Sequence, residues 1–501
     1  MSFPTIDLSW SRLAELFSYD ATSPLIFSSG LFLFLFAAFM LVYGRLRNAP
    51  TARIVYVVAF SLYFYYKSSG IYFLLLLFAS VSDFVLAQLI WHSRRRWAKR
   101  LWVTLSVLVN LGMLGYFKYT DFLIEIANSL FGEGFMQFRN IFLPVGISFF
   151  VFQSMSYTID IYRGQLRPLD RWIDYCFYLS FFPQLVAGPI VRARDFIPQI
   201  RQNPLRITRE MFGTGVCLIL TGLFKKAVIS DYISLNFVDR IFDEPLLYSG
   251  FECLMGIYGY ALQIYCDFSG YSDMAIGIAL LMGFRFPKNF DAPYRSATIT
   301  EFWRRWHISL SSWLRDYLYI SLGGNRKGRI RTYGNLLLTM LLGGLWHGAA
   351  VRFILWGGLH GAALALHKLW LAVVPGSKVL GRDMPWWCRL PGILLTFHIV
   401  CFGWLLFRAE SMQTVGLMLH QIFHAFDLRL VPQVVEGYLP VFALLGLGYL
   451  LHALPDAVDG LFRRAVVAAP MLVQVVMVAA VVWCVMQIKS SDIQPFIYFQ
   501  F

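Results

Sequence analysis

Long apolar runs separated by short basic segments are the feature that most restricts how this chain can fold. The run from Pro24 to Tyr43 has close to the ~20 residues that a helix needs to cross a bilayer. Inside the hydrocarbon layer every backbone N–H and C=O must be bonded internally, so such runs fold as helices. Further runs cover residues 54–66, 71–91, 101–117, 141–161, 211–229, 250–284, 353–371, 390–406, 437–453 and 468–486. We predict an all-α, polytopic integral membrane protein with roughly 11–13 transmembrane helices.

The charged residues support the same class. Of the 501 residues, 58% are apolar and 14% are charged, against roughly 45–50% and 25% in soluble domains. The net charge is +14, and the cations gather in the loops at 44–53, 92–100, 163–171 and 324–331. Basic loops mark the cytoplasmic side of a membrane protein. We therefore expect these four loops in the cytoplasm, the amino terminus outside it, and no nucleic-acid partner.

Two segments do not fit a simple span. Residues 1–22 lack a basic start followed by an apolar run, so we expect an interfacial segment there and not a cleaved secretion signal. Residues 174–192 are apolar but interrupted by Pro183, Gly188 and Pro189, between two arginine-rich loops. Such a segment must enter and leave on one side, which is tolerated only where protein or water covers the backbone. It therefore predicts a re-entrant segment beside a central cavity.

The stretch 301–361 carries three of the nine histidines. On a helical wheel residues 302–320 form two arcs, one aromatic and apolar, the other polar with Arg304, Arg305 and Arg315. That pattern is typical of a helix lying at a membrane surface with its aromatic side chains in the acyl boundary. His307 falls on the border between the arcs.

His347 is the single ionisable side chain between Leu336 and Val351. An ionisable group inside an apolar run is costly and therefore indicates a functional role. A neutral imidazole that only hydrogen-bonds a neighbouring helix is the alternative. Gly343, Gly344 and Gly348 around it allow close packing of helices or close approach of a substrate.

Other polar residues in apolar runs suggest a supporting network. Gln263, Asp267 and Asn289 are expected to line the cavity, whereas Lys225 and Lys226 are expected to extend to the membrane interface. The pair His420 and His424 has a metal-ligand spacing, but the glutamate of the HExxH motif and a third ligand are missing. Seven cysteines without a CxxC pair suggest neither a zinc site nor a disulfide framework. No bound metal or cofactor is expected.

Several long motifs resemble the membrane-bound O-acyltransferase (MBOAT) family, and most closely its bacterial branch that acetylates alginate and other polysaccharides. They are WRRWHISLSSWLRDYLYISLGG, GGLWHG, WGGLHG, LQIYCDFSGYSDMAIG, FPKNFDAPYRS, QLVAGPI and the terminal FIYFQF. The resemblance implies an MBOAT transmembrane domain over 23–501 with a catalytic core at about 140–371. It implies His347 as the catalytic residue and His307 as a second polar position. The substrate-binding candidates are Gln263, Asp267, Asn289, Arg304, Arg305, Trp346 and His360.

The same resemblance implies a reaction. Acetyl would come from cytoplasmic acetyl-CoA, with His347 as general base, and would cross the bacterial inner membrane to a periplasmic acetyltransferase partner and an exported polysaccharide. Alginate, cellulose and peptidoglycan all stay open as acceptors. One alternative is a D-alanyl-transfer protein of teichoic acid synthesis, which shares motifs of the WRRWHISLS kind. The other is a transporter or flippase with histidines as proton relays, but the two halves of the chain show no repeat of the kind that transporters have.

Overall fold

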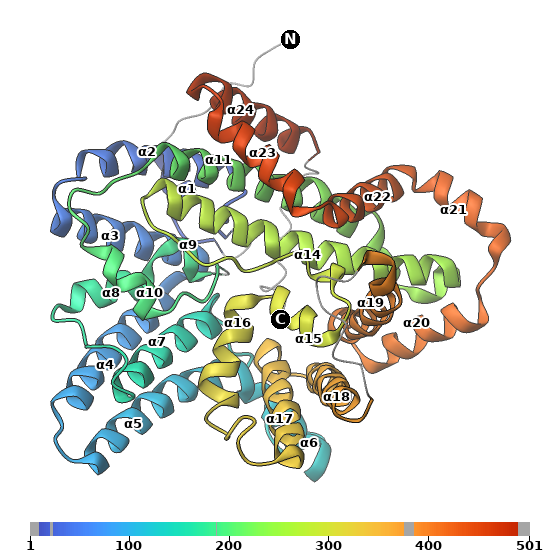
Figure 1. Cartoon of the computed structure of the whole chain (residues 1–501), viewed down its shortest axis with the longest axis horizontal. Helices are drawn as coiled ribbons and strands as arrows, with labels where there is room; N and C mark the ends of the chain where they lie inside the picture. Colours follow the sequence, from blue (N-terminus) through green and yellow to red (C-terminus); the bar gives the residue numbers. More distant parts are fainter. Residues whose placement is uncertain (1–9, 21–23, 187, 375–384, 489–501) are drawn as a thin grey trace. The chain divides into compact units, whose positions relative to one another are not determined.

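The computed structural model describes residues 10–20, 24–186, 188–374 and 385–488, and in these ranges every regular element is a helix (Figure 1). The chain divides into two compact units. The first comprises residues 1–206 and 282–284, and the second residues 207–281 and 285–501. The predicted all-α class is confirmed. The predicted division into an interfacial segment 1–22 and a membrane domain 23–501 stays a prediction.

The first unit consists of α1 to α10. Their bounds are Trp10–Phe17, Gly30–Arg45, Pro50–Ser69, Phe73–His92, Arg96–Leu114, Thr120–Phe131, Ile147–Tyr162, Trp172–Ser180, Phe182–Leu185 and Ala193–Ile200. Asp83 of α4 is fully buried and accepts hydrogen bonds from Ser106 and Asn110 of α5 at 2.5 and 2.6 Å, and from Ser154 of α7. Because a buried carboxylate is costly unless it is well bonded, Asp83 fixes these three helices together.

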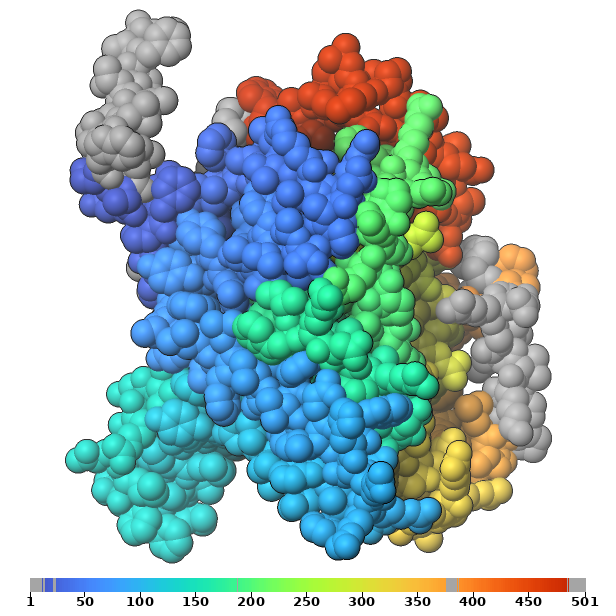
Figure 2. Space-filling model, turned by 90° about the vertical axis from the view of Figure 1, so that its left-hand side faces the viewer, coloured from blue at the N-terminus to red at the C-terminus, as the bar shows by residue number. Residues whose placement is uncertain are grey.

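The outer face of this unit has the character of a lipid-facing surface. Leu74, Phe78, Val81 and Val85 are exposed on α4 at spacings of three and four residues, which places them on one side of the helix. Leu101, Leu105, Leu108 and Leu111 repeat the pattern on α5. Figure 2 shows the face on which these blue to cyan helices lie. Exposed apolar stripes of this length are unusual in soluble proteins and suit contact with acyl chains.

Residues 174–192 do not form a span. The segment contains most of α8 and all of α9, which have 9 and 4 residues and are separated at Phe181. A nine-residue helix is about 13 Å long, less than half of the ~30 Å hydrocarbon layer. The side chains from Asp174 to Val186 are nevertheless buried. A broken, protein-covered segment is what the prolines and glycine predict.

The second unit contains α11 to α24. The bounds of α11 to α17 are Arg209–Leu223, Asp231–Ile233, Asp239–Asp243, Gly250–Leu281, Ile299–Arg305, Ile308–Trp313 and Arg329–His347. Those of α18 to α24 are Val351–Val373, Trp386–Arg408, Met412–His424, Val431–Gly437, Leu439–Ala453, Asp456–Ala468 and Met471–Ile488. The 32-residue α14 lies along α11, and the glycines Gly222 and Gly270 permit this approach because a Cβ on either would lie within 3 Å of the other's carbonyl oxygen.

Four helical stretches of the described chain are long and apolar enough to cross a membrane: 50–92, 96–131, 209–243 and 387–408. Two bent pairs, 428–453 and 456–483, raise the number to six if each counts as one span. The multi-pass membrane character is confirmed, although the expected count of 11–13 is higher. Several apolar runs are not among these spans because their helices are short, as in the 16-residue α2 and α7, or because a long helix carries polar side chains, as in the 32-residue α14.

Candidate active site

The stretch 302–320 is not one surface helix, which corrects the wheel-based prediction. α15 ends at Arg305 and α16 begins at Ile308, and between them His307 has a φ of 42°. A left-handed backbone is unfavourable for any residue with a Cβ. Moreover, Phe302, Trp306 and Leu310 of the aromatic arc are 1–2% exposed, so this arc packs into the protein and not into acyl chains.

Asn289 is the reason for the break. Its backbone carbonyl accepts the N–H of Ile308 at 2.9 Å, and its side-chain Oδ1 accepts the N–H of Ser309 at 3.2 Å and its Oγ at 2.8 Å. The Nδ1 of His307 lies 3.1 Å from the same Oδ1. These bonds satisfy the first N–H groups of α16, which have no partner within their own helix. They hold His307 fully buried at the junction.

His347 is the last residue of α17 and is 4% exposed. The ring of Trp346 contacts both histidines. Its centroid lies 5.0 Å from that of His347 and 6.5 Å from that of His307. The structure therefore brings His307, Trp346 and His347 of the predicted set into one cluster.

An aromatic wall surrounds His347. The rings of Trp356 and Phe407 lie with centroids 5.0 and 5.4 Å from His347, each edge to face. Beyond Trp356 lies the fully buried His360, 4.7 Å from it between ring centroids. Among the described residues neither ring nitrogen of His360 has a hydrogen-bond partner. His360 thus contacts the site through Trp356.

Glycines bring α18 close enough to α17 to build this wall. A Cβ on Gly344 would lie 2.2 Å from the carbonyl oxygen of Phe353, and one on Gly348 would overlap the Phe353 ring at 1.9 Å. Arg352 of α18 then fixes the Phe407 side of this wall, because its Nη1 donates to the carbonyl of Phe407 at 2.6 Å. The prediction that glycines near His347 serve close helix packing is confirmed at these two positions.

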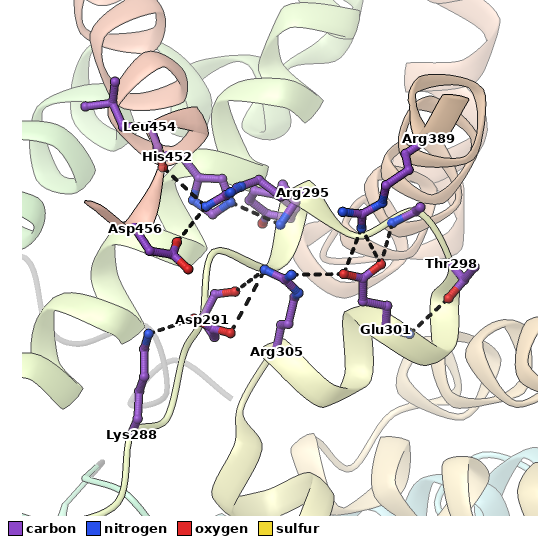
Figure 3. A network of polar contacts seen from close by, with 12 residues as sticks. Lys288, Asp291, Arg295, Thr298, Glu301, Arg305, Arg389, His452, Leu454 and Asp456 are labelled. Carbon is purple, nitrogen blue, oxygen red and sulfur yellow. Dashed lines mark hydrogen bonds and ion pairs between the residues drawn. The ribbon is translucent and has the colours of Figure 1, made fainter. Parts of the chain in front are cut away.

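Arg305 belongs to a second cluster, an arginine–carboxylate network close in sequence to His307. Figure 3 shows its guanidinium group between Asp291 and Glu301. Arg305 Nη2 lies 2.9 Å from Glu301 Oε1, and its Nη1 donates to the Asp291 carbonyl at 3.0 Å. Arg389 of α19 approaches both Glu301 oxygens at 2.9 and 2.8 Å. The network fixes α15 to α19 and to the segment that carries Asn289. Arg304, also predicted to bind substrate, is exposed.

The charge of Glu301 is well stabilised. Burial alone raises the pKa of its carboxyl, but the Ala297 N–H and the guanidinium groups of Arg389 and Arg305 more than offset burial. The pKa of Glu301 therefore lies below its ordinary value, and the carboxylate is ionised at neutral pH.

Gln263 and Asp267 of α14 belong to a third cluster. Gln263 donates to Ser234 Oγ at 2.8 Å, while Asp267 forms an ion pair with Lys226 at 2.5 Å. Lys226 also pairs with Asp231 at 2.8 Å, and Lys225 pairs with Asp273 at 2.7 Å. Gln263 and Asp267 thus take part in a polar network on α14, whereas their expected place at a cavity stays a prediction. The expectation of a lysine extending to the membrane interface is wrong for Lys226, which is 3% exposed and ends on two carboxylates. For Lys225, whose side chain is 27% exposed, it stays a prediction.

Sequence reasoning missed Trp356, Arg352 and Arg389. The two arginines lie within the apolar helices α18 and α19, and charged residues in such positions are a recognised signal of function or pairing. His420 and His424 are exposed on α20, and no group of three potential metal ligands occurs in the described ranges. The terminal FIYFQF motif at 496–501 lies outside the described residues.

Comparison with known proteins identifies the family of the chain. Residues 171–381 match the model of the MBOAT, membrane-bound O-acyltransferase family. A probable alginate O-acetylase, AlgI, of Pseudomonas aeruginosa is 42% identical over 405 residues, covering 80% of this chain and 75% of that protein. A peptidoglycan O-acetyltransferase of Helicobacter pylori is 35% identical over 432 residues, covering 80% of each. A teichoic acid D-alanyltransferase of Bacillus subtilis is 31% identical over 291 residues, covering 54% of this chain and 70% of that protein.

The chain belongs to the membrane-bound O-acyltransferase family. It is an acyltransferase, and its apolar helices make it a multi-pass membrane protein.

Proposed function

We propose that the protein takes acetyl from cytoplasmic acetyl-CoA and passes it across the bacterial inner membrane for O-acetylation of an exported polysaccharide. The names of the two O-acetyltransferase relatives support acetyl as the group transferred. Both cover a larger share of the chain than the D-alanyltransferase does. The acceptor is a polymer of the alginate, cellulose or peptidoglycan type, reached through a periplasmic acetyltransferase partner.

The observation that carries the proposal is the buried cluster of His307, Trp346 and His347. A base that activates the acceptor hydroxyl would also activate water, so acyl transfer from a thioester needs a proton acceptor in a place from which water is excluded. The aromatic side chains around His347 provide such a place. A positioned histidine is the side chain most often used to move a proton in this way.

His347 acts as the general base in this scheme. Its imidazole removes the proton of the acceptor hydroxyl while that oxygen attacks the thioester carbonyl carbon. The carbon–sulfur bond breaks, and the departing thiolate receives the proton from the imidazolium. The products are an acetyl ester and free CoA, and His347 returns to its neutral form.

The basic residues of the loops at 192–209 and 324–331 are suited to the anionic groups of the donor, since guanidinium and ammonium groups bind phosphates strongly. Charged contacts of this kind form equally with the bound donor and with the transition state. Their loss should therefore raise the donor concentration required and leave the chemical step nearly unchanged.

Inside-out membrane vesicles carrying the protein provide the test. Vesicles given acetyl-CoA labelled in the acetyl group, together with the periplasmic partner and polysaccharide inside, should release CoA and label the polymer. A carrier protein loaded with labelled D-alanine serves as the competing donor. Transfer of D-alanine without transfer of acetyl would refute the proposal in favour of the teichoic acid reaction. Transport of polymer without any acyl transfer would favour a flippase.

A further inference from the structure

The contacts of Asn289 determine which nitrogen of His307 carries the proton. Three groups approach the Oδ1 of Asn289: the Ser309 N–H at 3.2 Å, the Ser309 Oγ at 2.8 Å and the His307 Nδ1 at 3.1 Å. The Nδ2 of Asn289 lies 3.1 Å from the Oγ of Ser272. Asn289 is 1% exposed and His307 is fully buried.

The orientation of the Asn289 amide follows from one of these contacts. The oxygen and nitrogen of a side-chain amide are assigned from their hydrogen-bond partners. A backbone N–H can only donate, so the amide atom facing the Ser309 N–H must be the oxygen. The amide nitrogen then faces Ser272, whose hydroxyl can accept.

The tautomer of His307 follows in turn. Asn289 Oδ1 has no hydrogen to donate, so a hydrogen bond between it and His307 Nδ1 requires the hydrogen on Nδ1. In a neutral imidazole the other nitrogen, Nε2, then holds the lone pair. The Oγ of Ser309 is a weaker competitor for Nδ1, since it lies 3.4 Å from Nδ1 and 2.8 Å from Asn289.

The surrounding chain holds this arrangement in place. His307 has a left-handed backbone with a φ of 42°, and the carbonyl of Asn289 accepts the N–H of the next residue, Ile308. Two residues beyond Asn289, the Asp291 N–H donates to the carbonyl of Arg305 at 2.9 Å. The segment carrying Asn289 is therefore bound on both sides of His307, at Arg305 and at Ile308.

We infer that Asn289 is a positioning residue that fixes His307 as the Nδ1–H tautomer, so that His307 accepts a hydrogen bond from substrate through Nε2. This inference rests on the proposed acyl transfer and assigns a role within it. A neutral His307 in this form holds an O–H or N–H group of a substrate. It is not a donor to the oxyanion that develops on the thioester carbonyl, so that negative charge must be stabilised by other groups.

The direct test is a ¹⁵N spectrum of the protein in bilayers with all histidine ring nitrogens labelled. The resonances that disappear in a His307→Gln variant belong to His307. We expect Nδ1 to be protonated and Nε2 unprotonated. A protonated Nε2 with an unprotonated Nδ1, or a charged ring at neutral pH, would overturn the inference. The spectrum can be recorded without any acyl transfer. Its result therefore does not depend on whether the proposed reaction is correct.

Three variants connect the tautomer with transfer. Asn289→Leu removes the acceptor, so Nε2 should become protonated and transfer should fall by about 10²-fold or more, as when a histidine base is held in the wrong tautomer. Asn289→Asp keeps an oxygen beside Nδ1, so Nδ1 should stay protonated and transfer should exceed that of Asn289→Leu. Ser272→Ala removes the partner of the amide nitrogen but leaves the oxygen, and the tautomer should persist. An unchanged His307 spectrum in Asn289→Leu would contradict the role of Asn289.

Discussion

Glu301 is the carboxylate that joins Arg305 and Arg389 close in sequence to His307. It bonds Arg305 and Arg389 at 2.8–2.9 Å, and its side chain is 16% exposed. Replacement by glutamine leaves two guanidinium groups without their carboxylate, and we expect a loss of about 2–3 kcal/mol in the free energy of unfolding at pH 7. Asp195→Asn is the matched control, because the Arg194–Asp195 pair is 3.8 Å long with 45% and 63% exposed side chains. That control should cost about 0–1 kcal/mol.

The Glu301 effect has a defined pH dependence. Since the pKa of Glu301 is lower in the folded than in the unfolded protein, its stabilisation is complete above the unfolded value of about 4.3. It is lost as the pH falls through the folded pKa. The difference in thermal stability between wild type and Glu301→Gln should therefore stay constant from pH 8 to pH 6 and shrink below about pH 4. A difference that grew on acidification would contradict this assignment.

At the scale of single residues, the sequence predicted some of the site for sound physical reasons. His347 was identifiable because it is alone among apolar residues, and the structure buries it. The full burial of His307 could not be predicted from its place on a helical wheel, because the wheel assumes an unbroken helix. The break depends on Asn289, which lies 18 residues earlier in the chain.

The position of His347 at the end of α17 depends on how closely α18 packs against α17. Gly344→Ala places a Cβ 2.2 Å from the Phe353 carbonyl, so the helices must separate, and we expect a loss of about 1–3 kcal/mol. Gly334→Ala on the same helix is the control. Nothing lies within 4 Å of a Cβ at that position, and alanine there should stabilise by roughly 0.5–1 kcal/mol. Thermal unfolding in detergent compares the two. Equal midpoints would show that the approach of α18 is not what Gly344 serves.

At the scale of elements, apolar length predicted where most helices lie but not where they are divided. The 353–371 run corresponds to α18 and the 390–406 run lies within α19. The 211–229 run is different, because α11 ends at Leu223 and a π-helical segment continues from Phe224 to Ser230. Such segments are frequent at functional sites. Here Lys226 lies on this segment, and its partners Asp231 and Asp267 lie on neighbouring helices. A hydropathy pattern cannot predict such a pairing, because it depends on which helices pack together.

For the whole molecule, the testable property is its orientation in the membrane. The basic loops predict that residues 48 and 96 face the cytoplasm, and both positions are exposed in the structure. Asn48→Cys and Arg96→Cys should therefore react with a membrane-impermeant thiol reagent only after the inner membrane is opened. The exposed Cys388 must first be replaced by serine, and that parent gives the background. Ready labelling in intact spheroplasts would reverse the orientation.

His347, as the proposed base of acyl transfer, is the residue on which the activity of the whole molecule should depend most. The decisive measurement is acetyl transfer by His347→Ala in vesicles, with the amount of protein in the membrane determined for each variant. We expect a fall of roughly 10²–10⁴-fold, the usual contribution of a general base, with normal insertion because alanine suits an apolar helix end. His307→Ala should also impair transfer. His420→Ala, an exposed histidine of α20, should change it little. Acetylation near the wild-type rate by a well-inserted His347→Ala protein would contradict the account.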